Sequence, residues 1–422
     1  MLAFLRPRRP KPGARAEPAK AESAKLGGAA GAAPAPALID VKDLIARYSN
    51  DEHAARADGY FAKIADDAKL LRKPFFGIPD TQANMHGVAE VLQRLRLFPG
   101  ARVLDFGAGT GWFSRMLAFM ECAPVAVDVS AKALGLGERA FARDPLAAGL
   151  AIDWRAFDGR TLPLEDASMD RIVCYDSFHH VADQAATLRE FHRVLAEGGR
   201  AVFHEPGPQH SRIPVSQYEM RHFDVIENDI VIEDIWKLAR GIGFSNLELA
   251  LTTPHTASMP LGRYSRIIAG EATVQDVAAI LRSIADGAAN LRIFSMSKGE
   301  DTLDSRHGTG LAGSFQVTVT DAAGSVLRGR ARVTNTGSSP WRPSTGEVGS
   351  VSLGVKRPEL AQPDCGRIAL SDEVVPPGRT VEVEFSLPVP PDRPLRLAFD
   401  LVAEGVTWFE VLGSAPVHVT LD

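Results

Sequence analysis

The chain has 422 residues, a length that predicts two or three domains at about 150 residues per domain. Hydrophobic residues make up 45% and charged residues 23% of the composition, which excludes a disordered or fibrous protein. The formal charge is −5, but residues 1–37 carry seven basic against two acidic residues, so the remainder is strongly acidic. Such a body repels phosphate backbones, and we expect no nucleic-acid partner.

Residues 1–37 predict a disordered leader, because they are rich in Ala, Pro, Lys and Gly and lack hydrophobic periodicity. This leader is either a solvated tail or a basic segment that touches anionic lipid or polysaccharide. Its apolar start is too short for a secretory signal, and no stretch of about 18 apolar residues follows. The three cysteines lack disulfide or metal-site spacing. We therefore expect a cytoplasmic protein without a membrane span or a disulfide framework.

Residues 38–300 predict a doubly wound, Rossmann-like α/β domain. Strand-like and helical segments alternate, which is typical of a parallel sheet covered by helices on both faces. The expected strands are 101–106, 124–129, 151–157, 171–176, 201–206, 246–252 and 291–297. The expected helices lie near 111–120, between 130 and the early 140s, and near 184–196 and 231–241.

Two segments interrupt this alternation. Residues 207–223 predict a long polar loop, which is either functional, as long loops at a sheet edge tend to be, or a solvated connection. Residues 254–291 predict a helical insertion, because apolar residues recur at steps of three and four from Val274 onward. Thr273 and Asp276 have the spacing of a capping box, which places the start of that helix.

Residues 309–422 predict an all-β domain. Period-two alternation replaces helical periodicity after Gly299, and turn-forming residues separate the alternating runs. The expected strands are 313–320, 326–335, 348–356, 379–387, 394–403 and 407–420. This number of strands is enough for an immunoglobulin-like β-sandwich.

The clearest functional motif is VLDFGAGTGW at residues 103–112. Three alternate glycines end one predicted strand and open a helix, so bare backbone approaches a ligand and the helix N-terminus favours an anionic group. Asp128 ends the next predicted strand, where a carboxylate accepts hydrogen bonds from ribose hydroxyls. The G-x-G-x-G spacing differs from the G-x-G-x-x-G of nicotinamide and flavin dinucleotide sites. A purely structural turn is the alternative, which the strand–loop–helix context disfavours.

On these residues the chain resembles the class I S-adenosylmethionine-dependent methyltransferases. Residues 156–181 and 188–206 are similar to later blocks of that family, with FHHV at 178–181 and a Gly-Gly turn before the fifth strand. The resemblance implies S-adenosylmethionine as the cofactor and a seven-stranded sheet whose last strand is antiparallel.

The resemblance also implies roles for single residues. Asp105 is expected to meet the methionine amino group, the glycines to admit its carboxypropyl arm, and Asp128 to bind the ribose. Asp158 is expected near the adenine amino group. The implied cofactor-binding set is Asp105, Gly107, Ala108, Gly109, Gly111, Asp128 and Asp158.

Histidines gather where the predicted strands end, at the edge where open α/β sheets bind ligands. Methyl transfer to a hydroxyl requires removal of its proton, for which histidine is the natural residue type. We predict that His204 and Glu205 line the site, and they are candidates for the base. His180 is a further candidate, for which a packing role is equally open. We expect no metal, since no spacing matches a known ligand set.

The C-terminal segment resembles bacterial immunoglobulin-like domains appended to enzymes of surface-polysaccharide synthesis. This resemblance implies a glycan hydroxyl as the acceptor, with Trp341, Trp408 and Phe409 available to stack on sugars. Alternatively, both tryptophans fill the sandwich core, and the domain pairs subunits through exposed sheet edges. Two further functions stay open, which are methyl transfer to a small metabolite or lipid and a catalytically silent, cofactor-binding scaffold.

Overall fold

The computed structural model describes residues 37–63, 67–75, 77–251, 259–322, 324–360, 364–391 and 393–422. Almost all of the predicted leader, residues 1–36, lies outside this described part of the chain. Among the described helices, none combines the length and the apolar composition that crossing a membrane requires. The three cysteines are free thiols, as their spacing predicted.

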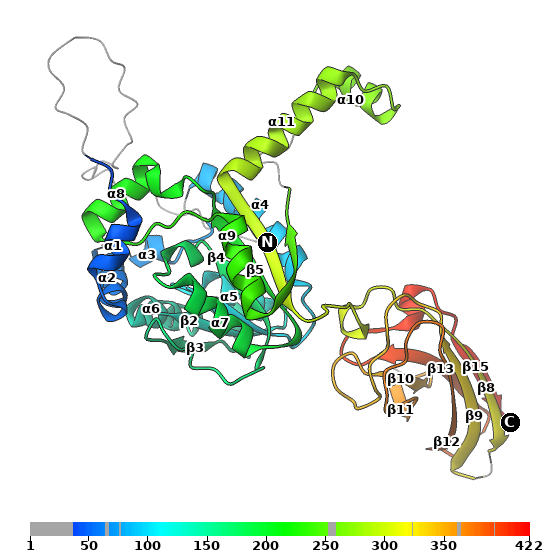
Figure 1. The fold of residues 1–422 in the computed structure, drawn as a ribbon. Helices are drawn as coiled ribbons and strands as arrows, with labels where there is room; N and C mark the ends of the chain where they lie inside the picture. The colour runs from blue at the N-terminus through cyan, green and yellow to red at the C-terminus, as the bar shows by residue number, and fades with distance from the viewer. Residues whose placement is uncertain are drawn as a thin grey trace, which may run out of the picture. The chain divides into compact units, whose positions relative to one another are not determined.

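A seven-stranded mixed sheet forms the centre of the first domain (Figure 1). Its order is β3-β2-β1-β4-β5-β7-β6, and β7 runs antiparallel to both of its neighbours. The strands are β1 Arg102–Phe106, β2 Ala123–Asp128, β3 Asp153–Ala156, β4 Met169–Tyr175, β5 Leu195–Pro206, β6 Phe244–Leu249 and β7 Leu291–Lys298. The Rossmann-like architecture and the antiparallel strand predicted from the sequence are confirmed.

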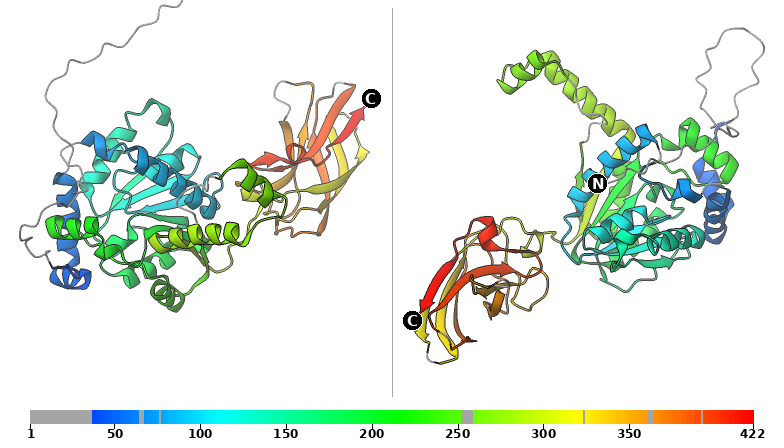
Figure 2. Two further views of the ribbon diagram at one scale, coloured as in Figure 1. Left: turned by 90° about the horizontal axis from the view of Figure 1, so that it is seen from above. Right: turned by 180° about the vertical axis from the view of Figure 1, so that it is seen from behind.

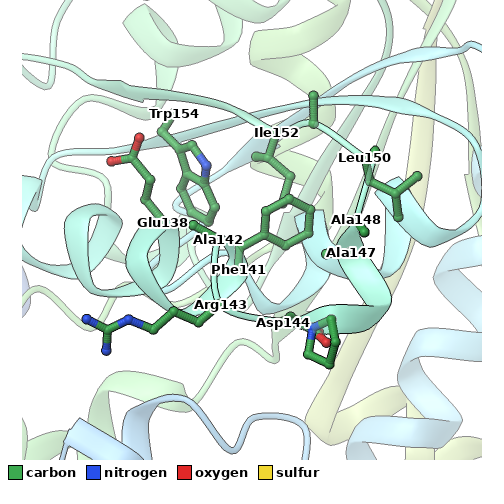
Figure 3. Close-up of a pocket in the computed structure, with 13 residues that line it drawn as sticks. Glu138, Phe141, Ala142, Arg143, Asp144, Ala147, Ala148, Leu150, Ile152 and Trp154 are labelled. Atoms are coloured by element: carbon green, nitrogen blue, oxygen red, sulfur yellow. The ribbon is translucent and has the colours of Figure 1, made fainter.

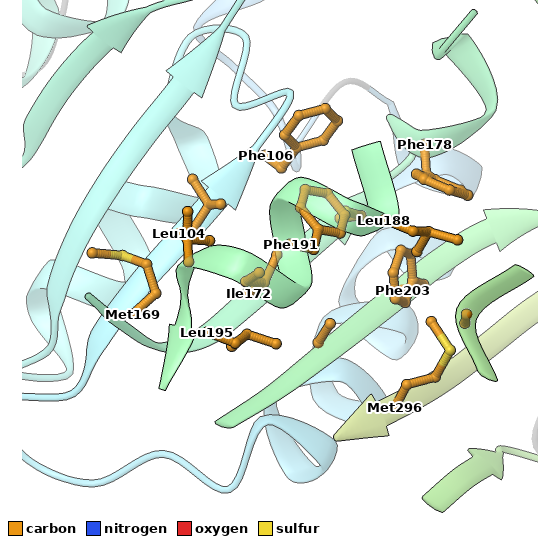
Figure 4. Packing of buried hydrophobic residues seen from close by; sticks show 14 of the residues in the cluster. Leu104, Phe106, Met169, Ile172, Phe178, Leu188, Phe191, Leu195, Phe203 and Met296 are labelled. Atoms are coloured by element: carbon orange, nitrogen blue, oxygen red, sulfur yellow. The ribbon is translucent and has the colours of Figure 1, made fainter. Parts of the chain in front are cut away.

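Helices cover both faces of this sheet (Figures 1 and 2). They are α4 Ile78–Leu95, α5 Trp112–Phe119, α6 Ala131–Phe141, α7 Gln184–Val194 and α9 Ile232–Ile242. Successive side chains of a strand point to opposite faces, so both faces of a buried strand are apolar. On β1, Val103 packs with α4 and α5, whereas Leu104 packs with α7 and α9. Figure 4 shows the second cluster, with Phe191 and Phe203 among its members.

The N-terminal helices pack against the segment that the sequence analysis assigned to a loop. Residues 207–223 instead contain the short 3-10 helix η3 His210–Arg212 and the helix α8 Pro214–Phe223, so the loop prediction is wrong. The fixed φ of Pro214 suits the first turn of a helix, and Met220 is buried with Leu44. The N-terminal helices are α1 Val41–Arg47, α2 Asn50–Lys63 and α3 Asp67–Leu70.

The predicted helical insertion contains α10 Leu261–Ile268 and α11 Val274–Asn290. The capping box of Thr273 and Asp276 is present, which confirms the predicted start of α11. Leu291 begins β7 instead of continuing the helix. Residues 254–258 of the predicted insertion lie outside the described residues.

The C-terminal region contains two β-sheets that share one apolar core. In the larger sheet the order is β11-β10-β13-β14, with β15 also paired to β13, and in the smaller sheet it is β12-β9-β8. The strands are β8 Gly313–Asp321, β9 Val326–Asn335, β10 Val351–Lys356, β11 Asp364–Ala369, β12 Thr380–Pro388, β13 Leu395–Ala403, β14 Thr407–Trp408 and β15 Val417–Leu421. The all-β prediction is confirmed, whereas its immunoglobulin-like identity stays a prediction.

Two details of this region differ from the sequence analysis. Residues 407–420 are not one strand, because the 3-10 helix η5 Phe409–Leu412 separates β14 from β15, and β11 was not predicted. The aromatic rings also differ in position. Trp341 and Phe409 are fully buried in the core, so sugar stacking by these two residues is wrong. Trp408 is half-buried, and the Lys356 ammonium lies 3.7 Å from its ring centroid.

Candidate active site

A cavity of about 690 Å³ lies at the carboxyl edge of the seven-stranded sheet. The loop after β1, the end of β2 and the segment after β4 form its base, and α2 and α8 contribute further walls. Open parallel sheets bind ligands at this edge, where the loops that follow neighbouring strands diverge. The cavity is therefore the candidate active site.

The glycine loop forms one end of this cavity, at residues 107–110. Gly107 has φ +69°, and a Cβ added there would lie 2.4 Å from Ser177 Cβ. Gly111 has φ +66° and caps α5, and a Cβ there would lie 2.3 Å from the Trp154 ring. Both positions combine a left-handed backbone with a close neighbour, so only glycine fits them. Ala108 and Gly109 line the cavity directly.

Asp128 lies at the end of β2 and lines the cavity beside this loop. Its Oδ2 accepts a hydrogen bond from the Gly109 N–H at 2.7 Å, and its Oδ1 accepts one from the Ser130 N–H at 2.8 Å. Burial raises the pKa of Asp128, while these two N–H groups oppose the rise. Each carboxylate oxygen keeps a further lone pair, so the group still accepts hydrogen bonds from a diol.

Titratable side chains gather at the other end of the cavity, where β4 ends. His179, His180, His210 and Glu227 all line it. Nδ1 of His180 donates to the Ile226 carbonyl at 2.6 Å, and Nε2 of His210 lies 2.6 Å from Glu227 Oε2. The rings of His179 and His180 have centroids 3.9 Å apart. The cavity thus has a backbone-lined end and an imidazole-lined end.

Residues 104–203, which contain the glycine loop, match the family model described as a methyltransferase domain. This segment is therefore similar to methyltransferase domains. The resemblance inferred from the glycine motif is confirmed at this level. The match contains β2, β3 and β4 completely and most of β1 and β5. It ends before the C-terminal sheets.

Several proteins are similar to this methyltransferase domain. A sarcosine/dimethylglycine N-methyltransferase of Aphanothece halophytica is 30% identical over 176 residues, which cover 39% of this chain and 60% of that protein. A ubiquinone/menaquinone biosynthesis C-methyltransferase of Xanthomonas campestris is 36% identical over 106 residues, 24% of this chain and 41% of that protein. The chain thus spans less than two thirds of the length of each of these relatives.

Solved structures of methyltransferases are more distant. A putative methyltransferase of Haloferax volcanii, in complex with its Trm112 activator, is 19% identical with a TM-score of 0.40, and the alignment covers 60% of this chain and all of that one. A phosphoethanolamine N-methyltransferase of Haemonchus contortus is 17% identical with a TM-score of 0.39, covering 62% of this chain and 61% of that one.

His204 and Glu205, which were predicted to line the site, lie behind the wall of the cavity. Neither His204 nor Glu205 is among the residues that line the cavity. His204 stacks on the Tyr175 ring at a centroid distance of 4.0 Å, and its Nδ1 lies 2.9 Å from Asp176 Oδ1. The other edge of the ring faces Gly87 of α4, where an added Cβ would lie 2.5 Å from Nε2. His204 is thus packed beside the cavity wall, and its role as the base stays a prediction.

Glu205 is fully buried and holds the chain that follows β4. Its Oε1 accepts from the N–H groups of Ser177 and Phe178, and its Oε2 accepts from the N–H and Nδ1 of His179. Burial raises the pKa of Glu205 to about 7, and the backbone donors oppose that rise. Of the three predicted catalytic residues, the structure brings only His180 to the cavity.

Asp105 and Asp158 have local partners in the methyltransferase domain. Oδ2 of the buried Asp105 accepts from the Ser114 N–H at 3.0 Å and from Ser114 Oγ at 2.7 Å. Asp105 does not line the cavity, and burial raises its pKa to about 6. Asp158 is exposed and accepts from the N–H groups of Arg160 and Thr161, although its neighbours Phe157 and Gly159 line the cavity. Cofactor contacts of both acids stay predictions.

The sequence analysis missed two groups of lining residues. Glu227 lies in a segment that has no motif, so nothing in the sequence marked it. Residues of α2 also line the cavity, among them His53 and Tyr60. They precede the glycine motif in the sequence, and only the packing of α2 brings them to the cavity. His179 was not missed, since the sequence places it with His180 just after the predicted strand 171–176, among the histidines expected at the sheet edge.

A second hollow lies near the edge strand β3 and has a different character (Figure 3). It is a depression of about 520 Å³ between α6, β3 and the turn around Asp144, with Phe141 and Trp154 among its lining residues. Glu138, Arg143 and Asp144 are its charged residues, and none belongs to a predicted motif. The cavity beside Asp128 contains the residues of the predicted motif, so that cavity and not this hollow is the candidate active site.

Proposed function

We propose that this protein transfers a methyl group from S-adenosylmethionine to a small acceptor that enters the cavity. The observation that carries the proposal is the glycine loop, which opens on the cavity with Asp128 hydrogen-bonded to Gly109. When bound, S-adenosylmethionine supplies an electrophilic methyl group on a sulfonium centre. The residues present fit this group, because the glycine positions leave room and Asp128 keeps free lone pairs.

The residues of the cavity orient the reactants. The N–H groups of Gly107 and Ala108 donate to the Val127 carbonyl. The N-terminus of α5, which follows the loop at Trp112, is therefore the part that favours an anionic end of a ligand. Asp128 accepts hydrogen bonds from a ribose. Phe106, Trp112 and Phe157 supply apolar walls that exclude water from the reacting atoms. Holding the methyl donor and the acceptor in line accounts for most of the catalysis that such a site requires.

A small acceptor suits the walls of this cavity. α2 and α8 supply lining residues opposite the sheet, so the acceptor end is enclosed by side chains such as Tyr60 and Glu219. The similar curated proteins carry names of enzymes that act on sarcosine or quinones. A glycan hydroxyl is the alternative acceptor, supported by the resemblance of the C-terminal sheets. Trp408 is then the one of the three predicted rings that is partly accessible.

The remaining expectations belong to the same proposal. We place the domain boundaries at 38–300 and 309–422, and we place the protein in the cytoplasm. Pairing of subunits through the C-terminal sheets is the second role that these sheets could have.

Labelled methyl transfer tests the proposal. The full-length chain is incubated with methyl-labelled S-adenosylmethionine and an extract of its source cells, and label is measured in the small-molecule, lipid and polysaccharide fractions. Label in the small-molecule fraction supports a small acceptor, and label in the polysaccharide fraction supports the glycan acceptor. Cofactor binding without transfer to any fraction would instead support the silent scaffold and overturn the enzyme.

A further inference from the structure

We propose that His179, His180 and Glu227 bind a divalent transition-metal ion, such as zinc, at the imidazole-lined end of the cavity. Each of these residues offers a ligand atom, and the three atoms lie within 4.8 Å of one another. Two imidazoles and one carboxylate form a ligand set that suits zinc and other first-row divalent ions. The inference goes beyond methyl transfer and does not rest on it.

The hydrogen bonds of the two imidazoles leave the required nitrogens free. Nδ1 of His179 donates to Glu205 Oε2 at 2.7 Å, and Nδ1 of His180 donates to the Ile226 carbonyl at 2.6 Å. In both rings the proton therefore sits on Nδ1, and Nε2 keeps its lone pair. Histidines that bind metals show this arrangement, in which the second ring nitrogen donates to a carboxylate or a backbone carbonyl.

The third ligand is oriented in a similar way. Nε2 of His210 lies 2.6 Å from Glu227 Oε2, and Glu227 Oε1 lies 3.7 Å from Nδ1 of His180, so binding through Nε2 of His180 requires that this partly exposed ring turn. Glu227 is nearly fully buried, with 5% of its surface exposed. A carboxylate buried beside three imidazoles is suited to a cation, because burial of a negative charge is costly without a positive partner.

The backbone joins the two segments that carry the ligands. The Asn228 N–H donates to the His179 carbonyl at 2.9 Å, and Asn228 Nδ2 donates to the Val181 carbonyl at 2.8 Å. These hydrogen bonds hold residues 226–228 against residues 179–181. The two segments are far apart in the sequence, since 46 positions separate His180 from Ile226. Such a fastened pair of segments keeps the ligand set preformed.

The distances fit a metal after a small adjustment. Two ligands about 2.1 Å from a tetrahedral zinc ion are about 3.4 Å apart, so atoms within 4.8 Å of one another need to approach by up to about 1.4 Å. The His180 side chain is 41% exposed and has room to move by that amount. Three protein ligands leave a coordination position open toward the cavity, which an oxygen or nitrogen of a small molecule is able to fill.

Direct metal binding tests the inference. The untagged full-length chain is freed of metal with a chelator and titrated with Zn²⁺ by calorimetry and with Co²⁺ by visible absorption. We expect one ion per chain and the absorption bands of a nitrogen- and oxygen-ligated Co²⁺ ion. His180→Ala and Glu227→Gln should each weaken Zn²⁺ binding at least about 100-fold. His180 is the safest site to vary, because it is partly exposed and its loss leaves no cavity in the core.

Two further variants sharpen this test. His53→Ala is the matched control, since His53 lines the same cavity from α2 but bonds to the Ile45 carbonyl, away from the ligand set. It should leave Zn²⁺ affinity within about twofold of the original value. Glu205 is a positioning residue, and Glu205→Gln should weaken Zn²⁺ binding about 10-fold and shift the Co²⁺ spectrum.

Two outcomes would overturn the inference. One is the absence of saturable binding at one ion per chain, and the other is binding that His180→Ala and Glu227→Gln reduce no more than His53→Ala. S-adenosylmethionine affinity is measured on the same samples. A chain that binds S-adenosylmethionine but no metal refutes the metal site alone, and a chain that binds metal but no S-adenosylmethionine refutes the proposed function alone.

Discussion

The two ends of the cavity are lined by different kinds of groups. At the glycine end the backbone of residues 107–110 forms the wall, together with the side chain of Asp128. At the imidazole end the polar groups are side chains, His179, His180, His210 and Glu227. A site made of backbone is damaged by adding atoms, whereas a site made of side chains is damaged by removing them. Substitutions at the two ends should therefore fail in different ways.

Adding one methyl group at the glycine end should have the largest effect. Gly107→Ala places a Cβ 2.4 Å from Ser177 Cβ on a residue with φ +69°. We expect the free energy of unfolding to fall by about 2–4 kcal/mol, measured by urea denaturation, with loss of S-adenosylmethionine binding. Gly149→Ala is the control, because φ is +83° there but nothing lies within 4 Å. It should cost about 1 kcal/mol, and equal losses in both variants would contradict the close-contact argument.

Removing the carboxylate at the glycine end should affect cofactor binding more than folding. Asp128→Ala deletes the acceptor that faces the cavity beside Gly109, and we expect S-adenosylmethionine affinity to fall about 10- to 100-fold by calorimetry. Glu138→Ala, in the hollow of Figure 3, should leave the affinity unchanged. An Asp128→Ala variant with the original affinity would remove the ribose contact from the proposal.

A substitution of His204 tests whether an imidazole that lies near the cavity, but does not line it, contributes to methyl transfer. His204→Ala removes the stacking partner of Tyr175 and the hydrogen-bond partner of Asp176. We expect the free energy of unfolding to fall by about 1–2 kcal/mol, while S-adenosylmethionine affinity stays within about twofold. If methyl transfer collapses while stability and affinity are unchanged, His204 is the base after all, and the cavity wall opens during turnover.

The last effect depends on pH and concerns the acid beneath the glycine loop. Burial raises the pKa of Asp105 from 3.8 to about 6, so between about pH 4 and 6 the folded state holds a proton that the unfolded state has released. The free energy of unfolding therefore decreases as pH rises through this window, by at most about 1.4 kcal/mol per pH unit. Asp105→Asn cannot ionise and should lack this contribution.

Urea denaturation of both proteins between about pH 4 and pH 6.5 measures this difference. Subtracting the two curves cancels the titration of other groups, such as Glu205, whose pKa is also raised by burial. Parallel curves would mean that Asp105 titrates normally in the folded state. It would then be accessible to solvent, which would favour the predicted contact with the methionine amino group.

Local patterns were sufficient for the sheet and for the glycine end. The alternation of strands and helices and the capping box of α11 follow from neighbours within a few positions of one another, whereas the antiparallel β7 was implied by the family resemblance. The glycine loop is equally local, because a strand, three glycines and a helix start are contiguous in sequence. The same reasoning separated the C-terminal strands, although the turn at η5 was hidden inside an apparently continuous run.

The imidazole end depends on contacts between segments that are far apart in the sequence, and local sequence patterns do not predict such contacts. Glu227 lies beside the two histidines because the neighbouring Asn228 is hydrogen-bonded to the His179 backbone. The helix α8 lines the cavity because Met220 packs against Leu44 of the N-terminal helix α1. His204 and Glu205 end the right strand, yet packing turned one against Gly87 and the other onto three backbone N–H groups. The direction in which a side chain at the end of a strand points is set by what packs around it, and that information is spread over the whole fold.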